Sequence, residues 1–79
     1  MSTAFVVITS EIGEEQNVIN QLKTIASVKD VKGVMGAYDI IVKLESDTSK
    51  ELNNTITNQI RKIKDVRTTL TLTVIDSQE

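Results

Sequence analysis

The chain has 79 residues, no cysteine, no histidine and a net charge of −2. One domain of this size buries only about 60–65% of its unfolded surface, and without disulfides or zinc ligands a small core is best supplemented by oligomerisation. The missing thiol and imidazole groups also argue against catalysis, so we expect no enzyme activity, no metal and no cofactor. The acidic balance argues against direct binding of nucleic acid, which needs a surplus of Lys and Arg on one face.

The N-terminal residues predict neither secretion nor insertion into a membrane. Met1–Thr9 has no basic segment, and the apolar run Ala4–Ile8 is much shorter than the hydrophobic part of a signal peptide or a membrane span. We therefore expect a cytoplasmic protein without membrane contacts. The chain is expected to form one domain over residues 1–79, with a polar, frayed tail at 76–79.

The first half of the chain predicts a strand, a helix and two further strands. Ala4–Thr9 is rich in β-branched residues, as strands are. A helix is expected from about Glu14, because acidic residues suit the positive end of a helix. Its apolar stripe consists of Val18, Ile19, Leu22, Ile25 and Ala26. Residues 31–37 and 38–45 then predict two strands, which the segment 36–39 joins as a tight hairpin.

The second half predicts another helix and a final strand. Thr48–Glu51 matches a capping box and begins the helix. Its apolar stripe is Leu52, Ile56, Gln59 or Ile60, and Ile63. Basic residues at its end are interpreted as a solvated helix terminus near the negative pole of the helix dipole: Arg61, Lys62, Lys64 and Arg67. Residues 66–75 alternate as a strand, and we expect Leu70 and Leu72 to face the helices while the threonines between them lie on the opposite face.

An internal repeat indicates how these elements combine. Residues 25–32 recur 35 residues later as 60–67, with the apolar and Lys-Asp positions in register. The order β-α-β-β-α-β with right-handed crossovers predicts an α+β, ferredoxin-like fold, a four-stranded antiparallel sheet with two helices on one face. The other face of the sheet is then uncovered. We expect it to pack on a second copy, giving a homodimer or a higher homo-oligomer.

Three motifs point to a known family. Gly36-Ala37-Tyr38-Asp39 fits the pattern G-x-Y-D and is followed by Ile40-Ile41-Val42, and Val66 leads to Thr69-Leu70-Thr71. From Val31 to Val74 the sequence thereby resembles the ligand-binding domain of the Lrp/AsnC family, also called the regulation of amino acid metabolism (RAM) domain. Family members usually have Pro-Gly before the last strand, where this chain has Lys64-Asp65, so that turn is expected to need another geometry.

The resemblance implies an effector, typically an amino acid, bound between subunits near the G-x-Y-D loop. Gly36 and Ala37 can offer backbone N–H groups to a carboxylate, and Asp39 can accept from an ammonium group. Hydroxyls of the last strand and two larger loop side chains would complete the pocket. The expected ligand-binding residues are Met35, Gly36, Ala37, Tyr38, Asp39, Thr69 and Thr71.

A purely structural interpretation of the same residues stays open. Gly36 is also a normal turn glycine, Asp39 a normal turn-capping acid, and alternating threonines are typical of any exposed strand face. Tyr38 can pack against a helix instead of touching a ligand.

The resulting hypothesis is an amino-acid sensing and oligomerisation module of Lrp/AsnC-type transcription regulation. Full-length members carry a winged helix-turn-helix, whereas this chain begins at its first strand, so we expect the sensor-only form, with full-length Lrp/AsnC regulators as candidate partners. One alternative is a structural oligomerisation module with an empty site. Another is a small dimeric α+β barrel enzyme, which the lack of histidine disfavours.

Overall fold

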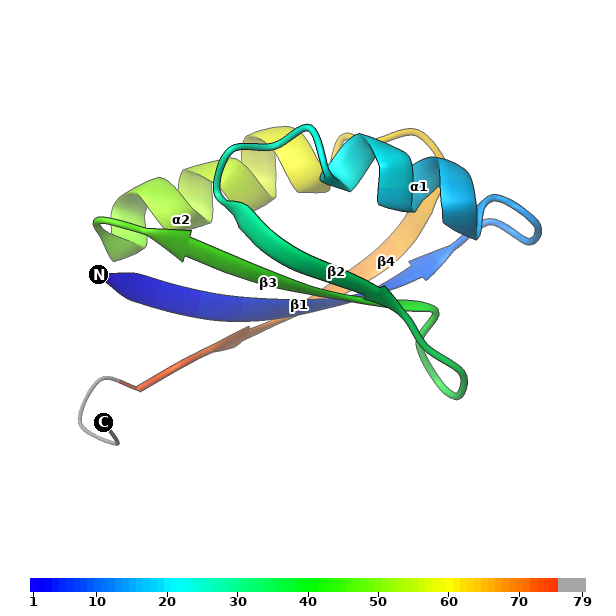
Figure 1. Ribbon diagram of the computed structural model, residues 1–79, viewed down its shortest axis with the longest axis horizontal. Helices are drawn as coiled ribbons and strands as arrows, with labels where there is room; N and C mark the ends of the chain where they lie inside the picture. The colour runs from blue at the N-terminus through cyan, green and yellow to red at the C-terminus, as the bar shows by residue number, and fades with distance from the viewer. Residues whose placement is uncertain (76–79) are drawn as a thin grey trace.

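The fold is a single antiparallel sheet of four strands with two helices across one face (Figure 1). The computed structural model describes residues 1–75, so the predicted tail at 76–79 lies outside the described residues. In chain order the elements are β1 (Ser2–Ser10), α1 (Glu15–Leu22), β2 (Val28–Gly33), β3 (Ile40–Ser46), α2 (Ser49–Thr55), a π-helical turn η1 (Ile56–Ile60) that continues α2, and β4 (Val66–Thr73). The strand order β2-β3-β1-β4 confirms the predicted ferredoxin-like fold. Within residues 1–75, every helix is too short or too polar to cross a membrane.

The hydrophobic core lies between the helices and the two central strands. Alternate residues of β1 and β3 are fully buried, because they point at the helix layer while their neighbours point away. The buried apolar residues are Ala4, Val6, Ile8, Val18, Leu22, Ile25, Ile40, Val42, Leu44, Leu52, Ile56 and Ile60. Ala26, predicted for the α1 stripe, is exposed. The reason is that α1 ends at Leu22, so helical periodicity no longer applies at Ala26.

The second helix begins at the predicted N-cap, with one of the two hydrogen bonds of the predicted capping box. The backbone N–H of Glu51 donates to the hydroxyl of Thr48 at 3.1 Å, and Thr48 has the extended backbone of an N-cap residue. Such a cap stabilises a helix by about 1 kcal/mol, because it satisfies a backbone donor that has no partner inside the helix.

The hairpin forms, but both of its strands are displaced from their predicted limits. β2 ends at Gly33 and β3 begins at Ile40, so the connection is the longer segment Val34–Asp39 rather than a tight turn at 36–39. β2 also begins earlier than predicted, at Val28. Lys29 and Asp30 are exposed on this edge strand. Because they are polar, the apolar alternation that predicts a strand does not extend over its first residues.

The prediction for the two faces of β4 is wrong. Leu70 lies opposite Val7 and Leu72 opposite Phe5, and these β1 residues are on the face away from the helices. Leu70 and Leu72 therefore lie on the face away from the helices, 48% and 51% exposed. Thr69, Thr71 and Thr73 lie on the helix side instead.

A β-bulge explains the reversal. The β1–β4 register shifts between Thr9 and Ser10, which face Thr68 and Val66, so Arg67 is an extra residue in β4. An extra residue reverses the alternation beyond it. Val66 packs against the core as predicted, but the residues that follow are on the opposite faces.

The turn into β4 has an unusual backbone. Asp65 has a φ of 75°, the only positive value for a residue other than glycine within 1–75. At the second position of Lys64-Asp65, the aspartate thus adopts the left-handed conformation that glycine favours. Its carbonyl accepts from the N–H of Glu11 at 2.8 Å, and its carboxylate accepts from the Asn17 amide at 3.3 Å. The turn is therefore joined both to the segment that follows β1 and to α1.

We predict that Asp65→Gly stabilises the fold by about 0.5–1 kcal/mol, because it removes the strain of a side chain at positive φ. Asp65→Val should cost more than about 1 kcal/mol, since a β-branched residue tolerates this conformation poorly. Asp30 occupies the matching position of the internal repeat, but its φ is not positive. Asp30→Gly should therefore destabilise the fold, because glycine only adds backbone freedom to the unfolded chain there. Urea unfolding at one protein concentration measures all three. An Asp65→Gly protein less stable than the parent would contradict the role given to the backbone.

Candidate functional site

The loop Val34–Asp39 extends beyond the sheet at the end where β2 turns into β3 (Figure 1). Its base is fixed by two backbone hydrogen bonds, from Val34 N to Asp39 O at 2.8 Å and from Asp39 N to Ile8 O at 2.9 Å. Its tip is in solvent, where Met35 is 100% exposed. Tyr38 is half-buried. The sheet thus holds the G-x-Y-D motif by its last residue and leaves the first part of the motif accessible.

Gly36 is required by its backbone conformation and not by crowding. Its φ is 134°, and a Cβ placed on it would meet no atom within 4 Å. Any L side chain would be strained there whatever the space around it. The open space beside Gly36 would let a ligand approach its backbone and that of Ala37, which is the role predicted for both residues.

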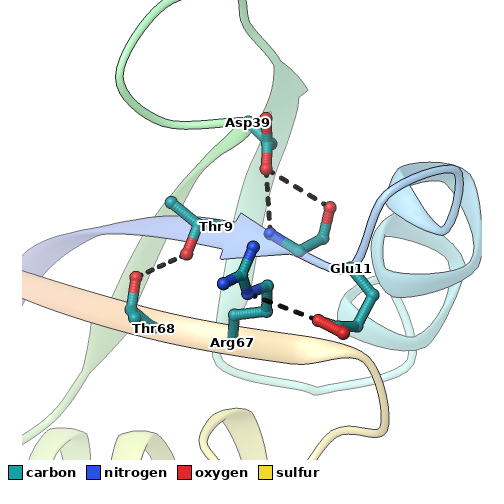
Figure 2. Close-up of polar contacts among 6 residues, drawn as sticks. Thr9, Glu11, Asp39, Arg67 and Thr68 are labelled. Carbon is teal, nitrogen blue, oxygen red and sulfur yellow. Dashed lines mark hydrogen bonds and ion pairs between the residues drawn. The ribbon is translucent and has the colours of Figure 1, made fainter.

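The carboxylate of Asp39 is partly committed to the fold. Figure 2 shows it directed at the end of β1, where Oδ2 accepts from the backbone N–H of Ser10 at 2.9 Å and from the Ser10 hydroxyl at 3.5 Å. Within residues 1–75, no hydrogen bond is shown to the other oxygen, Oδ1. One carboxylate can therefore anchor β1 and still offer an acceptor to a ligand, so the structural and ligand-binding interpretations of Asp39 are compatible.

The two threonines predicted for the site lie away from the loop within one chain. Thr69 is opposite Ile8 on β1, and Thr71 is opposite Val6 further along the strand. Because β1 lies between β3 and β4, the loop and Thr69 are separated by about two strand spacings, roughly 10 Å. Five cavities in the described part of the chain, of about 170 to 350 Å³, are all lined by residues outside Met35–Asp39. A single chain does not bring the seven predicted residues together.

The opposite side of the β1 end carries contacts that the sequence did not reveal. The Arg67 Nε lies 3.3 Å from the Glu11 carboxylate, and the hydroxyls of Thr9 and Thr68 are hydrogen-bonded across the strands (Figure 2). Arg67 and Arg61 line a cavity of about 290 Å³ together with Thr69. The basic charges at 61–67 were visible in the sequence, but only the bulge places Arg67 beside this cavity.

The face of the sheet away from the helices has an apolar centre. We call it the open face and define it by Phe5, Val7, Ile41, Leu70 and Leu72, which the strand registers place on one side. Charged side chains border it towards β2, where a hollow of about 170 Å³ is lined by Phe5, Asp30, Lys32, Ile41 and Lys43. The Lys43 ammonium lies 3.6 Å from the Glu45 carboxylate at this border.

The chain is therefore a two-layer α+β domain with one uncovered sheet face and a glycine loop fixed at its base. The family model for the Lrp/AsnC ligand binding domain matches residues 3–78. The chain belongs to this family, as the motifs predicted.

Solved structures agree with this assignment. FFRP-DM1 is 40% identical with a TM-score of 0.91, and the match covers 95% of this chain and 100% of that one. The hypothetical protein PHS023 from Pyrococcus horikoshii is also 40% identical, with a TM-score of 0.90 and coverage of 95% and 90%. A transcriptional regulator from Neisseria meningitidis, solved as a complex with L-Met, has a TM-score of 0.84 and coverage of 99% and 52%, but at 9% identity it shows the shared fold alone.

Curated relatives are much longer than this chain. The homocitrate synthase of Sulfurisphaera tokodaii is 45% identical over 58 residues, which are 73% of this chain and 12% of the enzyme. That of Saccharolobus solfataricus is 44% identical over 59 residues, or 75% and 13%. The chain therefore matches only a small segment of these enzymes.

We predict that Asp39→Ala destabilises the fold by about 1–3 kcal/mol, because the N–H of buried Ser10 loses its acceptor. Asp39→Asn keeps an oxygen at this position and should cost less than about 1 kcal/mol. Asp47→Ala is the control, since Asp47 is exposed. Urea denaturation compares the three. If Asp39→Ala were as stable as Asp47→Ala, the bond to Ser10 would not support the loop.

Proposed function

We propose that this chain is a cytoplasmic effector-binding and oligomerisation module of the Lrp/AsnC type, and that its effector is an amino acid. The observation that carries the proposal is the loop Val34–Asp39. It combines accessible backbone at Gly36 with a carboxylate of which one oxygen is committed to Ser10. Membership of a ligand-binding domain family supports the same assignment.

The two charged ends of an amino acid fit complementary groups of the loop. Backbone N–H groups at Gly36 and Ala37 suit a carboxylate, because successive N–H groups can form an anion-binding concavity. The Oδ1 atom of Asp39 suits an ammonium group, since charged hydrogen bonds are the stronger ones. Met35 and Tyr38 would then contact the side chain of the ligand. The exposed, apolar Met35 favours a ligand whose side chain is apolar.

The two threonines enter this site from a second subunit. One chain keeps Thr69 and Thr71 about two strand spacings from the loop. Both point to the helix side of the edge strand β4, so they can meet a ligand at the loop of another copy only through a contact at this edge, in addition to the open-face contact described next. The proposed site is therefore complete only in an oligomer, and ligand binding would change the stability of that oligomer.

The open face is the proposed contact between two copies. The bulge in β4 makes this face more apolar than the sequence predicted, because it places Leu70 and Leu72 there beside Phe5, Val7 and Ile41. Sheets pack face to face at about 10 Å through such side chains. A second copy would supply burial that a chain of 79 residues otherwise lacks.

A second candidate function concerns the partner. The match to a segment making up 12% of a homocitrate synthase, at 45% identity, indicates that a domain of this kind also occurs within an enzyme. This favours an alternative in which the module acts on an enzyme through its assembly, instead of on a DNA-binding regulator. Neither version gives the chain a catalytic step of its own.

We predict that at least one of the twenty amino acids stabilises the protein in a thermal-shift screen. A ligand at a hundred times its dissociation constant should add about 2.7 kcal/mol. In calorimetry, Asp39→Asn should weaken binding of that ligand by roughly 1.5–3 kcal/mol, whereas Lys50→Gln, at the start of α2, should leave it unchanged. If none of the amino acids stabilised the protein, the structural oligomerisation module would be the better interpretation.

We predict a dimer or larger species at micromolar concentration, held by the open face. Leu72→Lys should dissociate it, because each copy would bring a charge into an apolar contact. Thr73→Lys is the matched control, since the neighbouring side chain lies on the helix side of the same strand. Sedimentation distinguishes the assembly from the 8.7 kDa monomer. A parent protein that sediments as a monomer, or equal effects of both variants, would contradict this use of the open face.

A further inference from the structure

The end of the second helix and the start of β4 enclose a cavity that shares Thr69 with the proposed effector site and otherwise has residues of its own. The cavity measures about 290 Å³ and is lined by Arg61, Val66, Arg67, Thr68 and Thr69. We propose that this cavity, the basic notch, binds a small molecule through an oxyanion group, either a phosphate or a carboxylate. The inference rests on the basic notch alone and does not require an effector at the G-x-Y-D loop.

The two arginines provide donors with few internal partners. Arg61 follows the last residue of η1 and is exposed, and within residues 1–75 it forms no ion pair. Arg67 contacts Glu11 through Nε only, at 3.3 Å. A guanidinium carries five N–H donors in a fork that matches the oxygens of a carboxylate or phosphate. Most of these donors therefore remain available to a ligand in the basic notch.

The fold holds the walls of the basic notch in place. Val66 packs against the hydrophobic core, and Thr69 is paired with Ile8 in the sheet. The bulge at Arg67 lies between these two fixed points, and bulges commonly redirect a side chain. The hydroxyl of Thr69 adds a neutral donor beside the two cations. The backbone that forms the basic notch is thus fixed by the core and by the edge of the sheet.

Charge also favours an anion at this position. Lys62 and Lys64 lie in the same short segment as the two arginines, so positive charge is concentrated there in a chain whose net charge is −2. Such a concentration attracts anions from solution. The cavity is close to the lower limit of about 300 Å³ for small-molecule pockets, which indicates a compact ligand.

Glu11 acts as an internal counter-ion that an oxyanion would replace. Figure 2 shows its carboxylate beside the guanidinium of Arg67. The two side chains are 53% and 60% exposed, and ion pairs this exposed contribute little to stability. Exchanging this carboxylate for that of a ligand, or for a phosphate, would therefore cost the protein little.

The test is a titration of the ¹⁵N-labelled protein with inorganic phosphate and, separately, with citrate, at constant ionic strength. We expect saturable amide shifts centred on residues 61–69. Arg61→Gln and Arg67→Gln should each weaken binding about tenfold, the effect of losing one charged hydrogen bond. Glu11→Gln should strengthen it by about two- to fivefold, because it removes the competing carboxylate. Preference for phosphate or for citrate identifies which of the two ligand chemistries the basic notch takes.

Lys50→Gln is the control, because it removes one positive charge at the other end of the second helix. Circular dichroism verifies that each variant is folded. Shifts that spread over all basic residues, or a loss in Lys50→Gln equal to that in Arg61→Gln, would overturn the proposal. Weaker binding in Glu11→Gln would do so too. Tighter binding of duplex DNA than of either small anion, lost in Arg61→Gln, would instead show a nucleic-acid surface and exclude the small-molecule site.

Discussion

Coverage of the sheet on one side only is the constraint on which the rest of this molecule depends. The helices bury Val6 and Val42 completely, yet the alternating neighbours Val7 and Ile41 on the same central strands remain half-exposed. A β-strand cannot make one face apolar without sending the intervening side chains to the other face. Because those side chains are apolar as well, the fold is suited to a partner that covers them. The proposed assembly thus follows from how the core is built.

The end of β1 joins the two candidate sites. Ser10 is held by the carboxylate of Asp39 on one side, and the next residue, Glu11, contacts Asp65 and Arg67 on the other. A ligand that displaced the Asp39 carboxylate would therefore break its hydrogen bond to Ser10, the residue next to the one that pairs with Arg67. This short stretch of polar contacts gives the loop and the basic notch a common structural support.

Most of the architecture could be predicted because the signals are local. The stripe that includes Leu22 and the cap at Thr48 depend on periods and hydrogen bonds within a few residues, and both are found in the structure. The strand β2 was harder, since its edge position lets Lys29 and Asp30 be polar where an inner strand would be apolar. Of the candidate site, the sequence indicated the loop, but it did not indicate the bond from Asp39 to Ser10, which joins residues far apart in the chain.

The sequence by itself determined the order of elements, the family and the apolar alternation of the strands. Only the tertiary structure decided which residues of β4 lie on the open face. The sequence shows that apolar and polar residues alternate, but the bulge at Arg67 reverses the faces that they occupy. It also decided that, within one chain, Thr69 lies with Arg61 beside the basic notch and not with Gly36 at the loop. The physical reason is that pairing across strands sets which residues meet, and this pairing depends on register, a property of two segments and not of one.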